Sequence, residues 1–173
     1  MKKITLILFL SLVGLVGYAQ EATGLKFGFL SYQAVLQSMT DYTQVQADMA
    51  QLREKYQAEQ KRVEDDFNKK YEEFLDGQAS YPKSILQKRQ SELQEMLNKN
   101  IAFKKESQQL LEKAEAEALA PLKKRLADAL ATVGSARGLA FILNTDTNAA
   151  PWINITLGED VSEAVKAILN NAQ

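Results

Sequence analysis

The chain has 173 residues, of which 46% are apolar and 25% are charged, and its formal net charge is −1. It contains no cysteine and no histidine. These counts exclude disulfides, thiol nucleophiles, cysteine-ligated metal sites and any mechanism that needs an imidazole base or ligand. The near-neutral charge is not a signature of nucleic-acid binding, and the length suits one domain or two small ones.

Residues 1–19 have the pattern of a secretory signal peptide. Lys2 and Lys3 precede an apolar run that is shorter than the ~20 residues needed to cross a bilayer. Gly17 and Ala19 place small residues before a cleavage site after Ala19. No cysteine follows the run, so a lipoprotein anchor is excluded. We expect an exported protein that begins at residue 20 and is mildly acidic.

Both ends of this exported chain predict strands. Residues 25–30 (LKFGFL) are apolar at every second position, which indicates a strand, and Ser31 follows as the N-cap of a short helix over residues 32–39. Residues 139–143 (LAFIL) predict a buried strand, and residues 152–157 (WINITL) alternate as in a third strand.

The middle of the chain predicts a long helical hairpin over residues 42–133. Apolar residues recur mostly at steps of three, four or seven over residues 42–76, residues 77–82 (GQASYP) supply a turn, and a second helix covers residues 83–133. The first arm has an excess of acidic residues and the second an excess of basic ones, which favours antiparallel pairing. A first helix of ~54 Å exceeds the ~15 Å radius of gyration of a compact chain of this size, so we expect the hairpin to protrude.

The remaining segments, residues 20–41 and 134–173, predict a small split α/β body. Asp160 or Ser162 opens its closing helix. Three strands leave open edges and a thin core, so we expect the body to oligomerise. The residues expected in its core or subunit interface are Phe27, Phe29, Phe141, Ile142, Leu143, Trp152, Ile153 and Ile155.

The order of these elements resembles the Skp/OmpH family of periplasmic chaperones. Residues 25–42 (LKFGFLSYQAVLQSMTDY) are similar to the family's opening strand and helix, although Ser31 stands where an acidic or amide residue is usual and Thr40 where proline is usual. LAPLKKRLADAL at residues 119–130 and DVSEAVKAIL at residues 160–169 are similar to its closing segments. The combination of signal peptide, element order and hairpin carries the resemblance.

The resemblance implies an α+β, mostly helical fold that assembles as a jellyfish-like homotrimer. Unfolded outer-membrane proteins would be held in the periplasm, in a cavity between three hairpins, without ATP. The sequence agrees in having no GxxxxGK[ST] nucleotide-binding loop. No enzymatic activity, cofactor, metal or nucleic-acid partner is expected. Because familiar members are strongly basic and this chain is acidic, membrane or lipopolysaccharide contact stays open.

The distal hairpin supplies the residues expected to contact such a client, namely Phe67, Lys69, Lys70, Tyr71, Phe74, Tyr81, Lys83, Ile85, Leu86, Lys88 and Arg89. The aromatic and aliphatic residues of this set also suit the seam between the helices, and the cations also suit a solvated face. A structural or adaptor protein that docks a partner through the hairpin is the alternative function. Adjacent carboxylates such as Asp65 and Asp66 do not face one another on a helix, so they are poor acid/base pairs.

Overall fold

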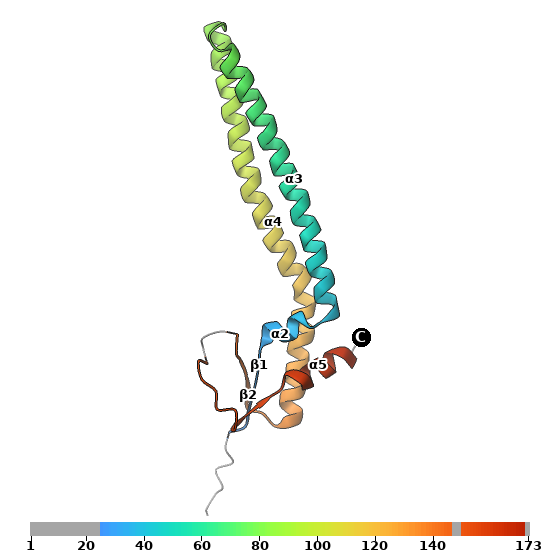
Figure 1. Ribbon diagram of the computed structural model, residues 1–173. Helices are drawn as coiled ribbons and strands as arrows, with labels where there is room; N and C mark the ends of the chain where they lie inside the picture. The colour runs from blue at the N-terminus through green and yellow to red at the C-terminus, as the bar shows by residue number, and fades with distance from the viewer. Residues whose placement is uncertain (1–24, 147–149, 172–173) are drawn as a thin grey trace, which may run out of the picture.

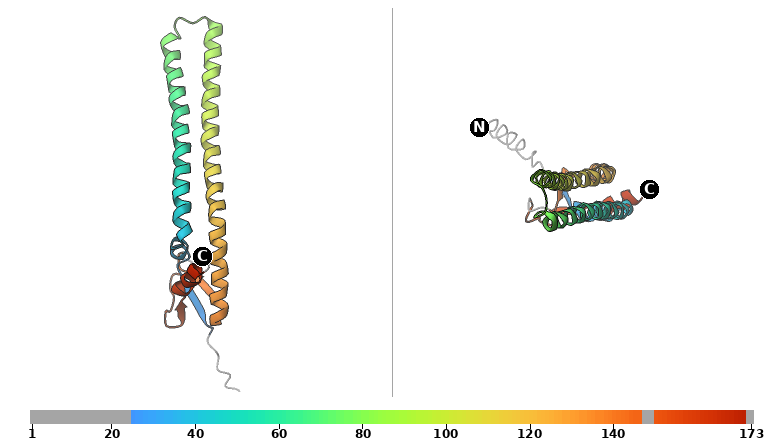
Figure 2. Two further views of the ribbon diagram at one scale, coloured as in Figure 1. Left: turned by 90° about the vertical axis from the view of Figure 1, so that its right-hand side faces the viewer. Right: turned by 90° about the horizontal axis from the view of Figure 1, so that it is seen from above.

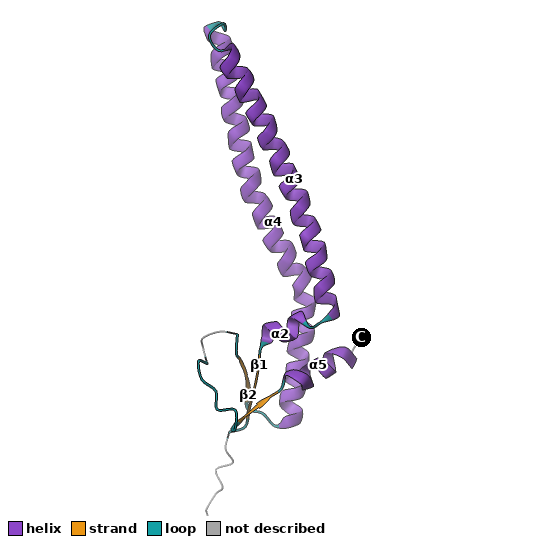
Figure 3. Cartoon of the chain, viewed as in Figure 1, coloured by secondary structure: helices purple, strands orange, loops and turns teal. Residues whose placement is uncertain are grey.

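A long helical hairpin rises from a small body in the computed structural model, which describes residues 25–146 and 150–171 (Figure 1). The predicted signal peptide lies outside these residues. In a perpendicular view the two hairpin helices run side by side above the body (Figure 2). Helix dominates the fold, with short strands confined to the body (Figure 3). The predicted mostly helical α+β arrangement is therefore confirmed.

The chain enters the body through strand β1 (Phe27–Leu30) and helix α2 (Tyr32–Gln37). As predicted, Ser31 caps this helix, since its Oγ accepts a hydrogen bond from the N–H of Ala34 at 3.0 Å. The helix ends before the predicted residue 39, where Ser38 Oγ donates to the carbonyl of Val35 at 2.7 Å.

The turn after strand β2 (Phe141–Asn144) fastens the start of α2. Asp146 accepts hydrogen bonds from Ser31 Oγ at 2.5 Å and from the N–H of Gln33 at 2.6 Å. Asn144 Oδ1 accepts from the N–H of Tyr32 at 3.2 Å. Free N–H groups at the start of a helix favour negative charge. Two segments from opposite ends of the chain are thereby joined.

The sheet is parallel and has the order β2-β1-β3, with β3 at Gly158–Asp160. Phe27 of the central strand is paired with Phe141 on one side and with Gly158 on the other. A side chain at Gly158 would collide with the Phe27 ring, so glycine permits this pairing. The strand predicted at residues 139–143 is present, shifted by one or two residues at each end, but its residues are half-buried or exposed rather than buried, because it lies at the edge of the sheet.

The third predicted strand was misplaced. Residues 152–157 do not form a strand, and β3 begins just after them. Asn154 Oδ1 accepts from both the N–H and the Oγ1 of Thr156, at 3.0 and 2.7 Å, and the Asn154 carbonyl accepts from the N–H of Leu157 and of Gly158. An Asn side chain that bonds its own backbone favours a turn, and this local preference outweighs the alternating pattern.

One hydrophobic core holds the body together. It combines Leu30 and α2 with the last turns of α4 (Lys83–Arg137) and with α5 (Ser162–Asn171). Leu126 and Val165 are fully buried at its centre. Full burial of such a side chain contributes ~1.5–3 kcal/mol. The members are Leu30, Val35, Leu36, Met39, Leu122, Leu126, Ala129, Val133, Val161, Val165 and Leu169.

The hairpin consists of α3 (Thr40–Gly77, 38 residues) and α4 (55 residues). At 1.5 Å per residue α3 is ~57 Å long. α4 continues through Pro121 and ends at Gly138, whose φ of 64° lies in the left-handed region that suits a glycine C-cap. The N–H of Leu139 closes that cap on the carbonyl of Gly134 at 2.9 Å.

Few ion pairs join the two arms. Among the described residues only Arg53–Glu115, at 2.7 Å, and Arg125–Asp41, at 2.5 Å, cross from α3 to α4. The other ion pairs of the hairpin lie within one helix at spacings of three or four residues. Apolar packing and local pairs, rather than the opposite charges of the arms, therefore dominate the contact between them.

We expect the substitution Asp146→Asn to lower the melting temperature of the protein. The hydrogen bond from Ser31, followed by that from the Gln33 N–H, holds the pKa of Asp146 below its ordinary value. A lowered pKa stabilises the fold above the unfolded-state pKa of ~3.9, and the contribution is lost as pH falls through the folded-state pKa. Melting followed by circular dichroism at several pH values measures both effects.

The matched control is Glu72→Gln, which changes an exposed carboxylate that has no hydrogen-bond or ion-pair partner among the described residues. It should leave the melting temperature nearly unchanged at neutral pH. The difference between wild type and Asp146→Asn should shrink on acidification below about pH 4. A difference that stays constant with pH would contradict the electrostatic account of this contact.

Candidate functional site

The distal half of the hairpin carries the predicted contact residues, and the structure distributes them between seam and surface. Phe74 is buried, with 9% of its surface exposed, so it belongs to the seam. Phe67, Tyr81 and Leu86 are half-buried, and Tyr71 and Ile85 are exposed. All five predicted cations, Lys69, Lys70, Lys83, Lys88 and Arg89, are exposed.

Tyr81 closes the tip of the hairpin. Its ring lies where a side chain at Gly77 would stand, so a larger residue there would displace the ring. Ser80 fixes the turn, since both its N–H and its Oγ donate to the carbonyl of Gly77, at 3.0 and 2.8 Å. Beneath the turn, Tyr81 and Phe74 line the same groove. The predicted turn at residues 77–82 is thus held by its own contacts.

Two polar side chains interrupt the apolar seam. Asn100 Nδ2 reaches from α4 to the carbonyl of Val63 in α3 at 3.0 Å. Ser107 is fully buried and donates to the carbonyl of Phe103, in its own helix, at 2.6 Å. The ring of Phe103 in turn lies 6.4 Å from that of Tyr56. A polar contact across a seam fixes the register of paired helices, which Asn100 does here.

Charged residues line one side of the hairpin, which we call the charged side. A groove of about 350 Å³ lies here, and its polar lining includes Lys70, Glu73, Arg89, Glu92, Glu95 and Lys99. In α3 the row Glu59, Arg62, Asp66, Lys70 and Glu73 follows this side, with the steps of three and four that keep residues on one helix face.

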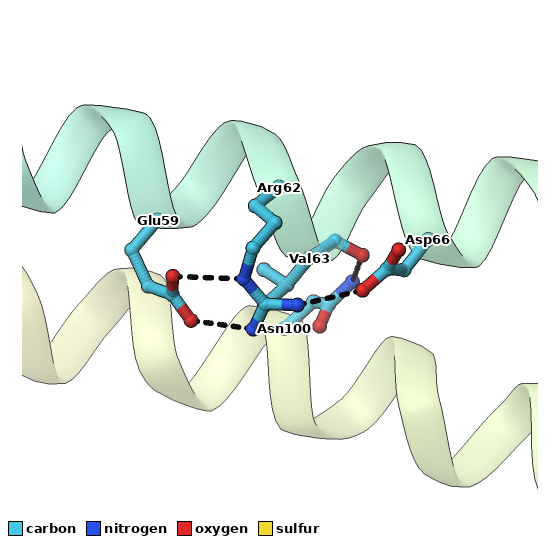
Figure 4. A network of polar contacts seen from close by, with 5 residues as sticks. All are labelled: Glu59, Arg62, Val63, Asp66 and Asn100. Atoms are coloured by element: carbon cyan, nitrogen blue, oxygen red, sulfur yellow. Dashed lines mark hydrogen bonds and ion pairs between the residues drawn. The ribbon is translucent and has the colours of Figure 1, made fainter.

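The charges of this side are largely paired with one another. Arg62 donates to both oxygens of Glu59, at 2.6 and 2.9 Å, and to Asp66 at 2.7 Å (Figure 4). The hydrogen bond from Arg62 holds the pKa of Glu59 below its ordinary value. Lys99 lies 2.6 Å from Glu95 and lowers the pKa of that carboxyl in the same way. In such a pair each charge is already neutralised by its neighbour, so neither group needs a ligand or partner protein.

Apolar residues gather on the other side, the apolar side. Helical spacing places Gln60, Glu64, Phe67 and Tyr71 in one row of α3, on the opposite flank of Val63 from the charged row. The rings of Phe67 and Tyr71 are stacked, with centroids 6.0 Å apart. From α4, Leu97, Ile101 and Lys104 complete a groove of about 280 Å³ with Gln60, Val63, Glu64, Phe67, Asn68 and Asn100.

The sequence analysis did not single out Leu97 and Ile101 as contact residues. Their side chains are 38% and 60% exposed. The helical period counts both among the apolar positions of the second helix, and it cannot tell a residue at the centre of the seam from one at its edge. The sequence offered one signal that they lie near the surface: Leu97, Ile101 and Lys104 follow one another at steps of four and three, so the two apolar residues share a helix face with a lysine.

The second predicted set lies on the sheet of the body. Phe27 and Phe29 alternate with the buried Gly28 and Leu30, so they lie on the outer face, where Phe27 stacks on Phe141 with centroids 5.6 Å apart. Trp152 and Ile155 are 78% and 73% exposed, whereas Ile142 packs against the core. Leu143 and Ile153 are half-buried. Leu25 and Leu157, which were not predicted, are also exposed.

Within residues 25–146 and 150–171 no acidic cluster could hold a metal ion. The same residues include no helix that is long and apolar enough to cross a membrane.

This architecture is similar to that of known proteins. A crystal structure of a candidate OmpH-like outer membrane chaperone from Caulobacter crescentus CB15 matches with a TM-score of 0.64. It covers 85% of each chain at 17% sequence identity, so it supports the fold. No curated protein matches significantly by sequence. The family model described as outer membrane protein (OmpH-like) matches residues 26–169, and the chain therefore belongs to the OmpH-like family.

Proposed function

We propose that this protein is an ATP-independent holdase chaperone that binds unfolded outer-membrane proteins in a cavity between the hairpins of a homotrimer. Membership of the OmpH-like family and the description of the Caulobacter protein support a chaperone role. The observation that carries the proposal is the hairpin itself, which projects from a small body and exposes apolar side chains along its distal half. The periplasm is the proposed compartment, because residues 1–19 have the pattern of a signal peptide.

The exposed face of the sheet supports the proposed trimer. A sheet whose strands have four, four and three residues leaves two short edges open. Its outer face presents Phe27, Phe29 and Phe141. Trp152 and Ile155, in the segment between β2 and β3, are also exposed. Exposed apolar patches of this kind mark interaction sites in soluble proteins. Three bodies packed through this face would hold three hairpins around one cavity.

The adaptor alternative requires a continuous apolar stripe that one folded partner could cover. The exposed apolar residues of the hairpin are instead scattered along ~38 Å of its distal part, at 1.5 Å per helical residue, and separated by charged residues. They are Tyr71, Leu75, Ile85, Leu97, Ile101 and Leu110. Dispersed weak contacts on three arms gain strength through high local concentration, which suits an unfolded client better than a folded one.

We expect the mature protein, residues 20–173, to be a trimer in solution, with a mass three times that of the monomer by size exclusion coupled to light scattering. Phe141→Asp should dissociate it, since burial of an unpaired carboxylate in an apolar interface costs several kcal/mol. Ile85→Asp is the matched control, because Ile85 on the hairpin is equally exposed at 43%. A wild-type monomer at micromolar concentration would refute the assembly.

We expect the mature protein to keep an outer-membrane β-barrel protein soluble after dilution from urea, with no nucleotide present. The exposed apolar residues of the hairpins should shield the unfolded chain from self-association. Light scattering of the diluted barrel measures the effect. Equal aggregation with and without the protein would eliminate the holdase proposal.

A shortened hairpin separates holding from assembly. The bond between Asn100 and Val63 puts these residues at the same level, so residues 64–99 can be replaced by a short glycine-rich turn between them. This variant should remain trimeric and lose most of its holding activity. Loss of the trimer would show that the arms, rather than the body, build the oligomer.

Removing the distal cations should weaken client capture more at low salt than at high salt. Exposed charges act over a Debye length of ~10 Å at 0.1 M salt, so added salt screens their contribution. The variant replaces Lys69, Lys70, Lys83, Lys88 and Arg89 with Gln. Its control replaces five exposed lysines nearer the body, Lys55, Lys61, Lys113, Lys123 and Lys124. Association rates measured by fluorescence anisotropy that do not depend on salt would argue against electrostatic steering.

A further inference from the structure

We infer that client chains contact the hairpin on its apolar side and not on its charged side. This inference rests on the proposed holdase function and names the surface that performs it. The occupant is an unfolded polypeptide segment in which aromatic or aliphatic side chains accompany a carboxylate. Tyr71, Leu97 and Ile101 form the contact, with Phe67 beneath them and Lys104 beside them.

The two sides differ in how many of their charged groups are already paired, because most of the charged side is paired and, among the described residues, only Lys70 and Glu73 of its groove and row have no ion-pair partner. On the charged side Arg62 is held between Glu59 and Asp66 (Figure 4). Lys99 is held by Glu95 in the same way. A client that used these groups would have to displace existing ion pairs. On the apolar side Lys104 has no ion-pair partner among the described residues. Glu64 lines the same groove but is not within ion-pair distance of Lys104, so the ammonium group of Lys104 is available to a carboxylate of the client.

Exposure of the apolar side chains is the second observation. Tyr71 is 45%, Leu97 38% and Ile101 60% exposed, and Phe67 stacks on Tyr71. Phe67, Leu97 and Ile101 line the groove of about 280 Å³ between the helices, and Tyr71 adjoins it through its contact with Phe67. Stacked aromatic rings with few rotatable bonds lose little entropy when they bind, so they are good anchors for another apolar side chain.

The size of the surface indicates what kind of partner it fits. Stable interfaces between folded proteins bury about 800 Å² on each partner. A few side chains that are half exposed offer a patch of only a few hundred Å². The groove therefore suits a short segment bound weakly, and repetition on three hairpins would supply the remaining affinity. A permanent folded partner would need a larger contact.

The chain contains a matched pair of variants that tests the assignment. Leu97→Gln with Ile101→Gln removes one Leu and one Ile from the apolar side of α4. Ile85→Gln with Leu110→Gln removes the same residue types from the charged side of the same helix, where both are 43% exposed. If clients bind only the apolar side, Ile85 and Leu110 do not belong to the dispersed client contacts described above, so this pair tests the choice of side directly. Gln is a good helix former, so neither change should disturb the hairpin.

The measurement is the dissociation constant of the trimer for a labelled, urea-unfolded outer-membrane β-barrel, followed by fluorescence anisotropy. The apolar-side pair should weaken binding about tenfold and the charged-side pair less than about twofold, because the effect is repeated on three arms. A photo-crosslinking residue at position 71 should capture the client, and one at position 110 should not. Equal weakening by both pairs, or equal crosslinking, would overturn the assignment.

The oligomeric state of both double variants is measured as well, because loss of the trimer would also weaken binding. If only the apolar-side pair dissociates the trimer, the patch is a contact between subunits and the inference is wrong. If the wild-type protein binds no client, both the proposed holdase function and this inference are wrong. If wild type binds and the apolar-side pair binds equally well, the holdase function stands and only the choice of side fails.

Discussion

The insertion of the last turns of α4 into the body determines the rest of the structure. Leu122, Leu126 and Val133 of this helix are at most 4% exposed, packed against α2, α5 and the central strand. The same helix then continues outward as one arm of the hairpin, so the core of the body fixes the direction of the arm. Pro121, which lacks an amide donor, lies at the point where α4 leaves the core. The main-chain hydrogen bond that Pro121 cannot donate is therefore missing at the boundary between the body and the hairpin.

Beyond that boundary the hairpin is stabilised mostly within each helix. Only two ion pairs in the described part of the chain cross between the arms, and both lie in the half nearer the body. The distal half relies on the seam, where Phe74 is buried and Asn100 bonds to Val63. Most charges of the charged side are paired locally, whereas the apolar side exposes Tyr71, Leu97 and Ile101. The asymmetry between the two sides therefore follows from how the hairpin is held together.

The sequence predicted the long elements well, and among the short ones that the structure describes it misplaced the third strand. Helical periodicity sustained over dozens of residues located α3 and α4 to within a few residues. A six-residue alternation was too short a signal, and at residues 152–157 the side chain of Asn154 made a turn instead. Periodicity also could not separate the centre of the seam from its edge. Phe74, which was expected to contact a client, is buried, whereas Ile101, which was not in that set, is 60% exposed.

Helical arms also suit the proposed client for a reason that concerns the main chain. Precursors of β-barrels have unpaired backbone groups that add readily to an exposed sheet edge. Within a helix the main-chain N–H and C=O groups are paired internally except at the ends, so a hairpin offers a client side-chain contacts only. The sheet edges in the described part of the chain are the short strands β2 and β3, four and three residues long, at the opposite end of the molecule from the distal grooves. Contact through side chains alone tolerates many sequences and leaves the backbone of the client free to form its barrel after release.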